Sequence, residues 1–238
     1  MEAAFRARYD DSKAGRSLTA VQLFDDSRMT APSGRFHIVF CLDESGSMAG
    51  QKWSDVVAAY RLLISRRQND QALEDVVSVI TFSSWSRSQG QMLPLARAPA
   101  SLTYTGGDTS FAPPLADALA AMQAGPADCT PLLVFMSDGQ NHDGGTAPLS
   151  AMGQMVASMR GRNLQVHTIA FQALGGEAML RQLAAEGGGT FHSAADGVQL
   201  ARTFSSIAAG CTAMDALVQR FGDILSEQIA FKIRADFL

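Results

Sequence analysis

Four short apolar runs along the chain have the length and composition of buried β-strands, and a shorter fifth run follows them. They comprise residues 36–42, 76–82, 132–136, 164–171 and 190–192. Runs that are apolar at nearly every position are typical of parallel strands covered by helices on both faces. Residues 87–97 have no helical period, so we expect a short hairpin or an edge strand there.

Amphipathic helices are predicted between these strands, because apolar residues recur there at steps of three and four. These patterns cover residues 53–64, 111–122, 149–159, 179–183 and 198–204. Strands that alternate with helices predict an α/β fold in which helices flank a doubly wound, mostly parallel central sheet. The ligands of such sheets bind beyond the carboxyl ends of the strands, where the strand order reverses.

The composition of the 238 residues is typical of a globular protein, with 47% hydrophobic and 18% charged residues. Lys and Arg number 19 and Asp and Glu number 23, which gives a formal net charge of −4. This balance argues against a nucleic-acid partner, because nucleic-acid binders need a basic face. The odd number of cysteines excludes a disulfide framework and a Cys-rich zinc site; they are Cys41, Cys129 and Cys211.

The N-terminal segment gives an expectation about location. Its first twelve residues carry five charged side chains and no apolar run, so we expect no signal peptide there. No stretch of about 18 apolar residues occurs in the chain, so we expect no membrane span. These two observations predict a cytoplasmic protein.

Three oxygen-rich segments stand at predicted strand or helix ends. Asp-Glu-Ser-Gly-Ser at 43–47 follows the first strand, and Ser-Asp-Gly at 137–139 follows the third apolar run. Gly-Gly-Asp-Thr-Ser at 106–110 directly precedes a helix. We expect all three to meet at one edge of the sheet. Their candidate ligands are oxygens, which favours a hard divalent cation: Mg²⁺, with Mn²⁺ or Ca²⁺ as alternatives.

This set of residues resembles the von Willebrand factor A domain, also called the integrin I-like domain. The metal-ion-dependent adhesion site of that family combines a D-x-S-x-S loop with a Thr and an Asp from two further loops. The matching residues are Asp43, Ser45, Ser47, Thr109 and Asp138. The resemblance implies a Rossmann-like fold, a bound Mg²⁺ whose coordination shell is completed by an Asp or Glu of a partner protein, and no catalysis.

The resemblance covers about residues 36–209 and divides the chain into three parts. Residues 1–35 are interpreted as an N-terminal extension, and residues 210–238 as a C-terminal amphipathic helical extension behind a break at Gly210. An apolar stripe runs along this extension from Met214 to Ile229. We expect the stripe to be buried, either against the domain itself or in self-association or a partner contact.

Other interpretations of the site residues stay open at this point. Asp43 and its serines could form only a helix-capping turn, and Thr109 could be only a helix N-cap. Glu44 and Asp108 are expected to support or border the site rather than bind the metal. We interpret His142 and Asp143 as solvated loop residues, and His37, His167 and His192 as packed or surface histidines.

Two alternative functions stay open, one among binding proteins and one among enzymes. The chain could be a regulatory subunit of a larger assembly, such as an AAA+ ATPase or a chelatase-like complex, which the resemblance permits. It could also be a metal-dependent hydrolase. However, Gln51 and Trp53 stand where a phosphate loop needs Gly and Ser or Thr. Ser45 stands where an aspartyl phosphatase needs a second acid, so we expect no enzyme activity.

Overall fold

The computed structural model describes residues 34–139, 141–143, 145–173 and 177–212. Its elements follow one another in the order β1 (Phe36–Asp43), η1 (Gly46–Met48), α3 (Gln51–Asn69), β2 (Val76–Phe82), β3 (Ser86–Pro94), η2 (Leu95–Arg97), α4 (Ala112–Ala124), β4 (Thr130–Ser137), α5 (Ala147–Ser158), β5 (Gln165–Phe171), α6 (Glu177–Glu186) and β6 (Thr190–Ala194). A last helix covers residues 197–212. The predicted alternation of strands and helices is therefore confirmed.

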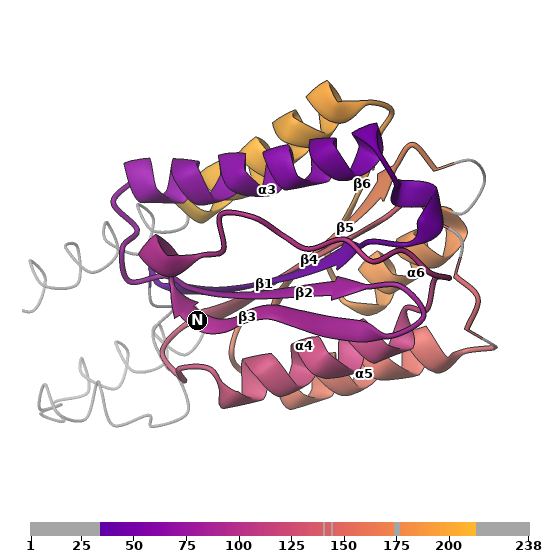
Figure 1. Cartoon of the computed structure of the whole chain (residues 1–238). Helices are drawn as coiled ribbons and strands as arrows, with labels where there is room; N and C mark the ends of the chain where they lie inside the picture. Colours follow the sequence, from indigo (N-terminus) through magenta and orange to yellow (C-terminus); the bar gives the residue numbers. More distant parts are fainter. Residues whose placement is uncertain (1–33, 140, 144, 174–176, 213–238) are drawn as a thin grey trace, which may run out of the picture. The chain divides into compact units, whose positions relative to one another are not determined.

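A single six-stranded sheet has the order β3-β2-β1-β4-β5-β6. Every neighbouring pair is parallel except β2 and β3, which are antiparallel. The predicted edge strand in 87–97 is thus β3. Figure 1 shows α3 and the helix of residues 197–212 on one face of the sheet and α4 and α5 on the other. This arrangement is the doubly wound α/β fold expected from the sequence.

Two apolar cores form because each central strand buries both of its faces. Along β1, Ile38 and Phe40 pack into the core under α3, whereas Val39 and Cys41 pack into the core over α4 and α5. Successive side chains of a strand point to opposite faces, so this alternation follows from strand geometry. All three cysteines are buried.

The strand order reverses at β1, which pairs with β2 on one side and with β4 on the other. The register aligns Asp43 with Phe82 at the end of β2, and Leu42 with Met136 near the end of β4. The carboxyl ends of these three strands therefore lie side by side. Ligands of doubly wound sheets bind at such a reversal.

One predicted boundary differs from the structure. The last helix was expected to end near Ala209 with a break at Gly210, but residues 210–212 are helical. A Cβ at Gly210 would meet no atom within 4 Å, so this glycine stands on an open helix face. A single glycine there costs the helix only about 1 kcal/mol, which is too little to end it. The predicted apolar stripe and residues 1–33 lie outside the described residues.

Candidate metal centre

Asp43 is the last residue of β1 and the most enclosed member of the site. Its side chain is 0% exposed. Its Oδ1 accepts a hydrogen bond from the backbone N of Ser45 at 2.7 Å, and its Oδ2 accepts one from the hydroxyl of Ser137 at 2.6 Å. The Asx turn of the simpler interpretation is therefore present, but it does not cap α3, whose N-cap is Gly50 with no side-chain hydrogen bond. The two hydrogen bonds fix the orientation of the Asp43 carboxylate at the start of the loop.

Ser45 and Ser47 place their hydroxyl oxygens next to each other, 3.2 Å apart. Two adjacent ligands of an octahedral Mg²⁺ at 2.0–2.1 Å are separated by about 3 Å. The hydroxyl pair thus has the spacing that one edge of a magnesium coordination shell requires. Ser45 is buried and Ser47 is exposed, so the pair faces from the loop toward solvent.

The loop that carries Thr109 is held against the first loop by its backbone. Gly46 N donates to Gly107 O at 2.8 Å, and Ser110 N donates to Ser83 O at 2.8 Å. Gly107 has φ +121°, and a Cβ there would lie 2.9 Å from the Ser83 hydroxyl. Glycine is therefore required at 107 for both its backbone conformation and the close approach. Thr109 itself is buried in this junction.

Thr109 is not the N-cap of α4. The backbone N atoms of Phe111 and Ala112 instead donate to Oδ2 of Asp143, at 2.6 and 2.7 Å. Asn141 Oδ1 adds a third contact to Phe111 N at 3.1 Å. The interpretation of Asp143 as a solvated loop residue is therefore wrong. Its role was invisible in the sequence because the cap comes from about 30 positions downstream.

Asp138 follows β4 and is almost enclosed, with 8% of its side chain exposed. Its Oδ2 accepts a hydrogen bond from Nζ of Lys52 at 2.9 Å. Lys52 belongs to the first turn of α3. Nothing in the spacing of the two residues, which are 86 positions apart, indicated this ion pair.

Glu44 is buried and fully committed to other groups. Arg87 Nη2 lies 3.0 and 2.9 Å from its two carboxylate oxygens. Thr105 donates to it from both its backbone N and its hydroxyl, at 3.1 Å each. Glu44 therefore anchors the neighbouring segment, in line with a supporting role. Asp108 forms an exposed contact with His142 at 2.5 Å, so it borders the site.

The electrostatics of this edge are unbalanced at Asp43. Burial and, to a smaller extent, the nearby charge of Asp138 raise the pKa of Asp43 to about 6, although the hydrogen bonds from Ser137 and Ser45 act to lower it. No Lys, Arg or His of the described residues forms an ion pair with Asp43. A buried carboxylate without a cation is unfavourable. A dication among these oxygens would remove the imbalance.

The donor set fits a lightly held hard cation rather than a soft one. In the part of the chain that the structure describes, no three His, Cys, Asp or Glu side chains gather as a metal cluster. The candidate ligands here are two carboxylates and three hydroxyls, from Asp43, Ser45, Ser47, Thr109 and Asp138. Oxygen ligands of this kind suit Mg²⁺, which binds through few carboxylates and keeps several waters.

Three aromatic side chains lie at the same edge. The Tyr104 hydroxyl donates to Ser45 O at 3.0 Å, and its ring lies 5.6 Å from that of Trp53. Trp85 is 65% exposed in the turn after β2. This turn contacts the Thr109 loop through Ser84, whose hydroxyl accepts from Asp108 N at 3.0 Å. Exposed aromatic residues are enriched in protein interfaces; the sequence analysis did not single out Trp85.

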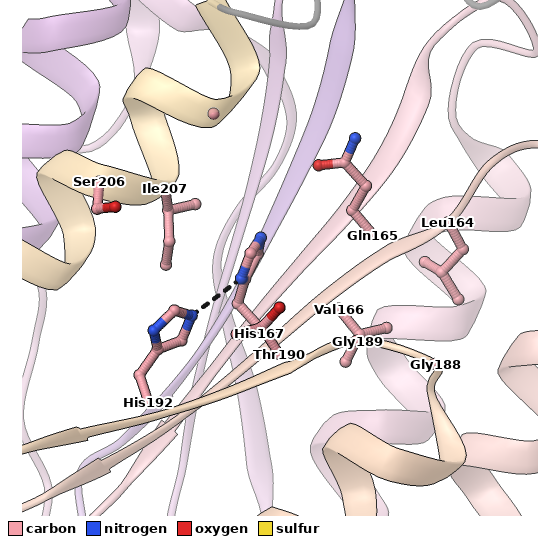
Figure 2. Close-up of a pocket in the computed structure, with 11 residues that line it drawn as sticks. Leu164, Gln165, Val166, His167, Gly188, Gly189, Thr190, His192, Ser206 and Ile207 are labelled. Atoms are coloured by element: carbon pink, nitrogen blue, oxygen red, sulfur yellow. Dashed lines mark hydrogen bonds between the residues drawn. The ribbon is translucent and has the colours of Figure 1, made fainter.

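A separate pocket of about 330 Å³ lies at the amino-terminal ends of β5 and β6. Figure 2 shows His167 and His192 facing each other in it, with a hydrogen bond of 3.0 Å between Nδ1 of the first and Nε2 of the second. Burial lowers the pKa of His167 to about 4 and also lowers that of His192. The described residues that line the pocket include no carboxylate, so they do not suit a hard cation.

Comparison with known families identifies the type of domain. The sequence model of the von Willebrand factor type A domain matches residues 37–206. No curated protein sequence matches the chain. No helix in the described ranges is long and apolar enough to cross a membrane.

Several solved structures share the fold. They include the pilus adhesin SpaC from Lactobacillus rhamnosus GG (TM-score 0.62, 15% identity, 75% of this chain and 30% of that one). For a von Willebrand factor type A protein from Catenulispora acidiphila, the TM-score is 0.60 and the identity 19%, over 75% of this chain and 43% of that one. For the ArnB paralog VWA2 from Sulfolobus acidocaldarius, the TM-score is 0.55 and the identity 21%, over 72% of this chain and 44% of that one. The chain thus spans less than half the length of each.

Proposed function

The chain belongs to the von Willebrand factor type A domain family, and on that basis we propose that it is a metal-dependent protein-binding module. In this proposal a Mg²⁺ at the candidate metal centre recognises an acidic residue of a partner protein. Mn²⁺ or Ca²⁺ would substitute for it. Asp43, Ser45, Ser47, Thr109 and Asp138 would hold the ion, some of them through water.

One observation carries the proposal: Asp43 is fully buried next to a second carboxylate, and the described residues give it no cation. Its partners are a backbone N–H and a hydroxyl. Hydrogen bonds of this kind orient a carboxylate, but they do not neutralise it. A charge buried in this way is stabilised when a cation binds from outside the chain.

The donor set also supports an external ligand for the ion. Two carboxylates cancel the charge of a dication, and the hydroxyls add no charge. When bound, the ion would supply an electrophilic open position. Ser45 and Ser47 would orient it, while Glu44 would hold the neighbouring segment through Arg87. An external carboxylate is the natural occupant of such a position.

The names of solved proteins that share this fold support a protein partner. The structures that share it include a pilus adhesin and the PilB minor pilin from Streptococcus sanguinis, at 15% and 14% identity. The exposed Trp85 beside the Thr109 loop offers apolar contact area for such a partner. The cytoplasmic location expected from the sequence stays a prediction.

Titration calorimetry with Mn²⁺ tests the metal site directly. We expect binding by the unmodified chain and loss of binding by Asp138→Ala. Asp108→Asn is the matched control, because it removes a carboxylate from the same edge that we do not assign to the ion. Unchanged Mn²⁺ affinity in Asp138→Ala would remove the basis of the proposal.

Affinity capture from a lysate then tests the partner. The chain is used as bait in Mg²⁺ and in EDTA, with Asp138→Ala as the control. Proteins retained by the unmodified chain only in Mg²⁺ are the expected result. Retention that is identical in EDTA would mean that any partner binds elsewhere on the surface.

We further propose that the chain does not catalyse a reaction. Ser45 stands two residues after Asp43, where an aspartyl phosphatase needs its proton donor, and Gln51 breaks the phosphate-loop pattern. The expected result is no turnover of ATP or of a generic phosphoester in Mg²⁺. Steady turnover that disappears in Asp43→Ala would favour the hydrolase alternative.

A further inference from the structure

The amino-terminal end of α3 carries a lysine at the candidate metal centre. Lys52 is the second residue of the helix, and its Nζ donates to Oδ2 of Asp138 at 2.9 Å. A cation in the first turn is disfavoured by the positive end of the helix dipole. No acidic residue stands in that turn to compensate. The ion pair with Asp138 therefore compensates the unfavourable position of Lys52 at the start of the helix.

Three enclosed carboxylates at this edge differ in whether a cationic side chain pairs with them. Arg87 pairs with Glu44, and Lys52 pairs with Asp138, whereas no cationic side chain of the described ranges pairs with Asp43. A bound dication brings two positive charges to Asp43 and Asp138. Lys52 already supplies one positive charge to Asp138, a carboxylate that the ion would need.

We propose that Lys52 is a built-in competitor of the metal ion: its ammonium group holds Asp138 in the metal-free state and leaves it when the ion binds. This inference rests on the proposed function. The side chain can make the exchange, because a quarter of it is exposed and its four-carbon stem is flexible. An ammonium group that leaves Asp138 can reach water without passing through the core.

A purely supporting role makes the opposite prediction. If Lys52 only positioned Asp138 for the ion, its removal would weaken metal binding. If it competes, its removal tightens binding. Partly exposed ion pairs of this kind contribute about 1 kcal/mol, which corresponds to about fivefold in an equilibrium constant. The sign of the change therefore distinguishes the two roles.

The experiment measures Mn²⁺ affinity by calorimetry for the full chain and for Lys52→Gln and Lys52→Met. We expect each variant to bind Mn²⁺ about fivefold more tightly than the unmodified chain. Lys52→Arg keeps the cation and should keep the original affinity. Arg66→Gln is the control for net charge, because it removes one cation from the same helix about 21 Å away, 14 residues at 1.5 Å each.

Thermal melting gives a second readout that needs no partner. Without Lys52, Asp138 lacks its cation in EDTA, so Lys52→Gln should melt at a lower temperature there and gain more from Mn²⁺ than the unmodified chain. Unchanged or weaker binding in both variants, with normal binding by the unmodified chain, overturns the inference alone. Absence of Mn²⁺ binding in every form overturns the proposed function and this inference together.

Discussion

Two buried aspartates, one at the carboxyl ends of the strands and one at their amino ends, differ in whether a cationic side chain pairs with them. Asp43 ends β1 at the carboxyl edge, and Asp75 precedes β2 next to the start of β1. Both are almost fully enclosed. Burial raises the pKa of both carboxyl groups. The two carboxyl groups are therefore buried to the same extent, and they differ in the groups that contact them.

The chain itself supplies a cation and a hydrogen-bond donor to the Asp75 carboxylate. Arg67 donates to its Oδ2 from Nε at 2.8 Å, and Phe36 N donates to its Oδ1 at 2.9 Å. Arg67 also stacks over the Phe36 ring and reaches Thr212 in the last helix. This ion pair therefore joins α3, the start of β1 and the last helix. Its role is structural.

Asp43 has hydrogen bonds but no ion pair with a cation of the described residues, and the charge of a second carboxylate, Asp138, acts on it. Burial alone therefore does not mark a functional carboxylate. A buried charge that the chain neutralises serves the fold. A buried charge without a cation from the chain is the basis on which we propose a bound metal ion.

Removal of the Asp43 side chain tests the difference between the two aspartates most directly. We expect Asp43→Ala to abolish Mn²⁺ binding in calorimetry, because the ion loses its buried carboxylate. Asp75→Ala should bind Mn²⁺ unchanged at a temperature where it remains folded. Equal effects of the two substitutions on Mn²⁺ affinity would show that the carboxyl edge is not special.

Arg67→Met tests the opposite edge. Removing one partner of a buried ion pair leaves an uncompensated charge, so we expect a loss of about 3–5 kcal/mol in the free energy of unfolding. Urea denaturation followed by circular dichroism measures it. Mn²⁺ affinity should not change, and Arg61→Met, at an exposed position of the same helix, should cost much less.

The pH dependence of metal binding sharpens the role of Asp43. Because burial raises its pKa to about 6, protons compete with the ion below that value. We expect the Mn²⁺ affinity to be flat above pH 6 and to fall toward tenfold per pH unit below it. Calorimetry between pH 5 and 7.5 measures this. A profile that stays flat down to pH 5 would contradict the assigned ligand.

The smallest expected effect is a gain in metal-free stability. At pH 7 the folded state holds Asp43 ionised although its pKa is raised to about 6, which costs about 3 kcal/mol. An amide can accept from only one of Ser45 N and the Ser137 hydroxyl, which offsets part of this gain, so Asp43→Asn should add about 1 kcal/mol to the free energy of unfolding in EDTA. The amide oxygen can still accept from Ser137. Asp75→Asn should lower stability instead, because Arg67 then lacks its counter-charge. Denaturation of both variants in EDTA decides whether the signs differ.

The sequence by itself determined the elements and the edge at which the candidate site lies. Apolar periodicity is a local property, so the strands, the helices and the edge strand β3 could be predicted from it. Parallel strands align their carboxyl ends, so residues that follow different strands were expected together. The structure brings Asp43, Ser45 and Ser47 into one loop beside the loops of Thr109 and Asp138.

Only the tertiary structure decided how the charges at this edge are paired. Glu44 meets Arg87 from 43 positions away, and Lys52 meets Asp138 from 86. Asp143 caps α4, which begins about 30 residues earlier in the chain. Such pairs depend on which loops the folded sheet brings together, and neither residue carries a local signal of its partner. The sequence therefore determined where the carboxylates gather, and the fold decided which of them stays without a cation.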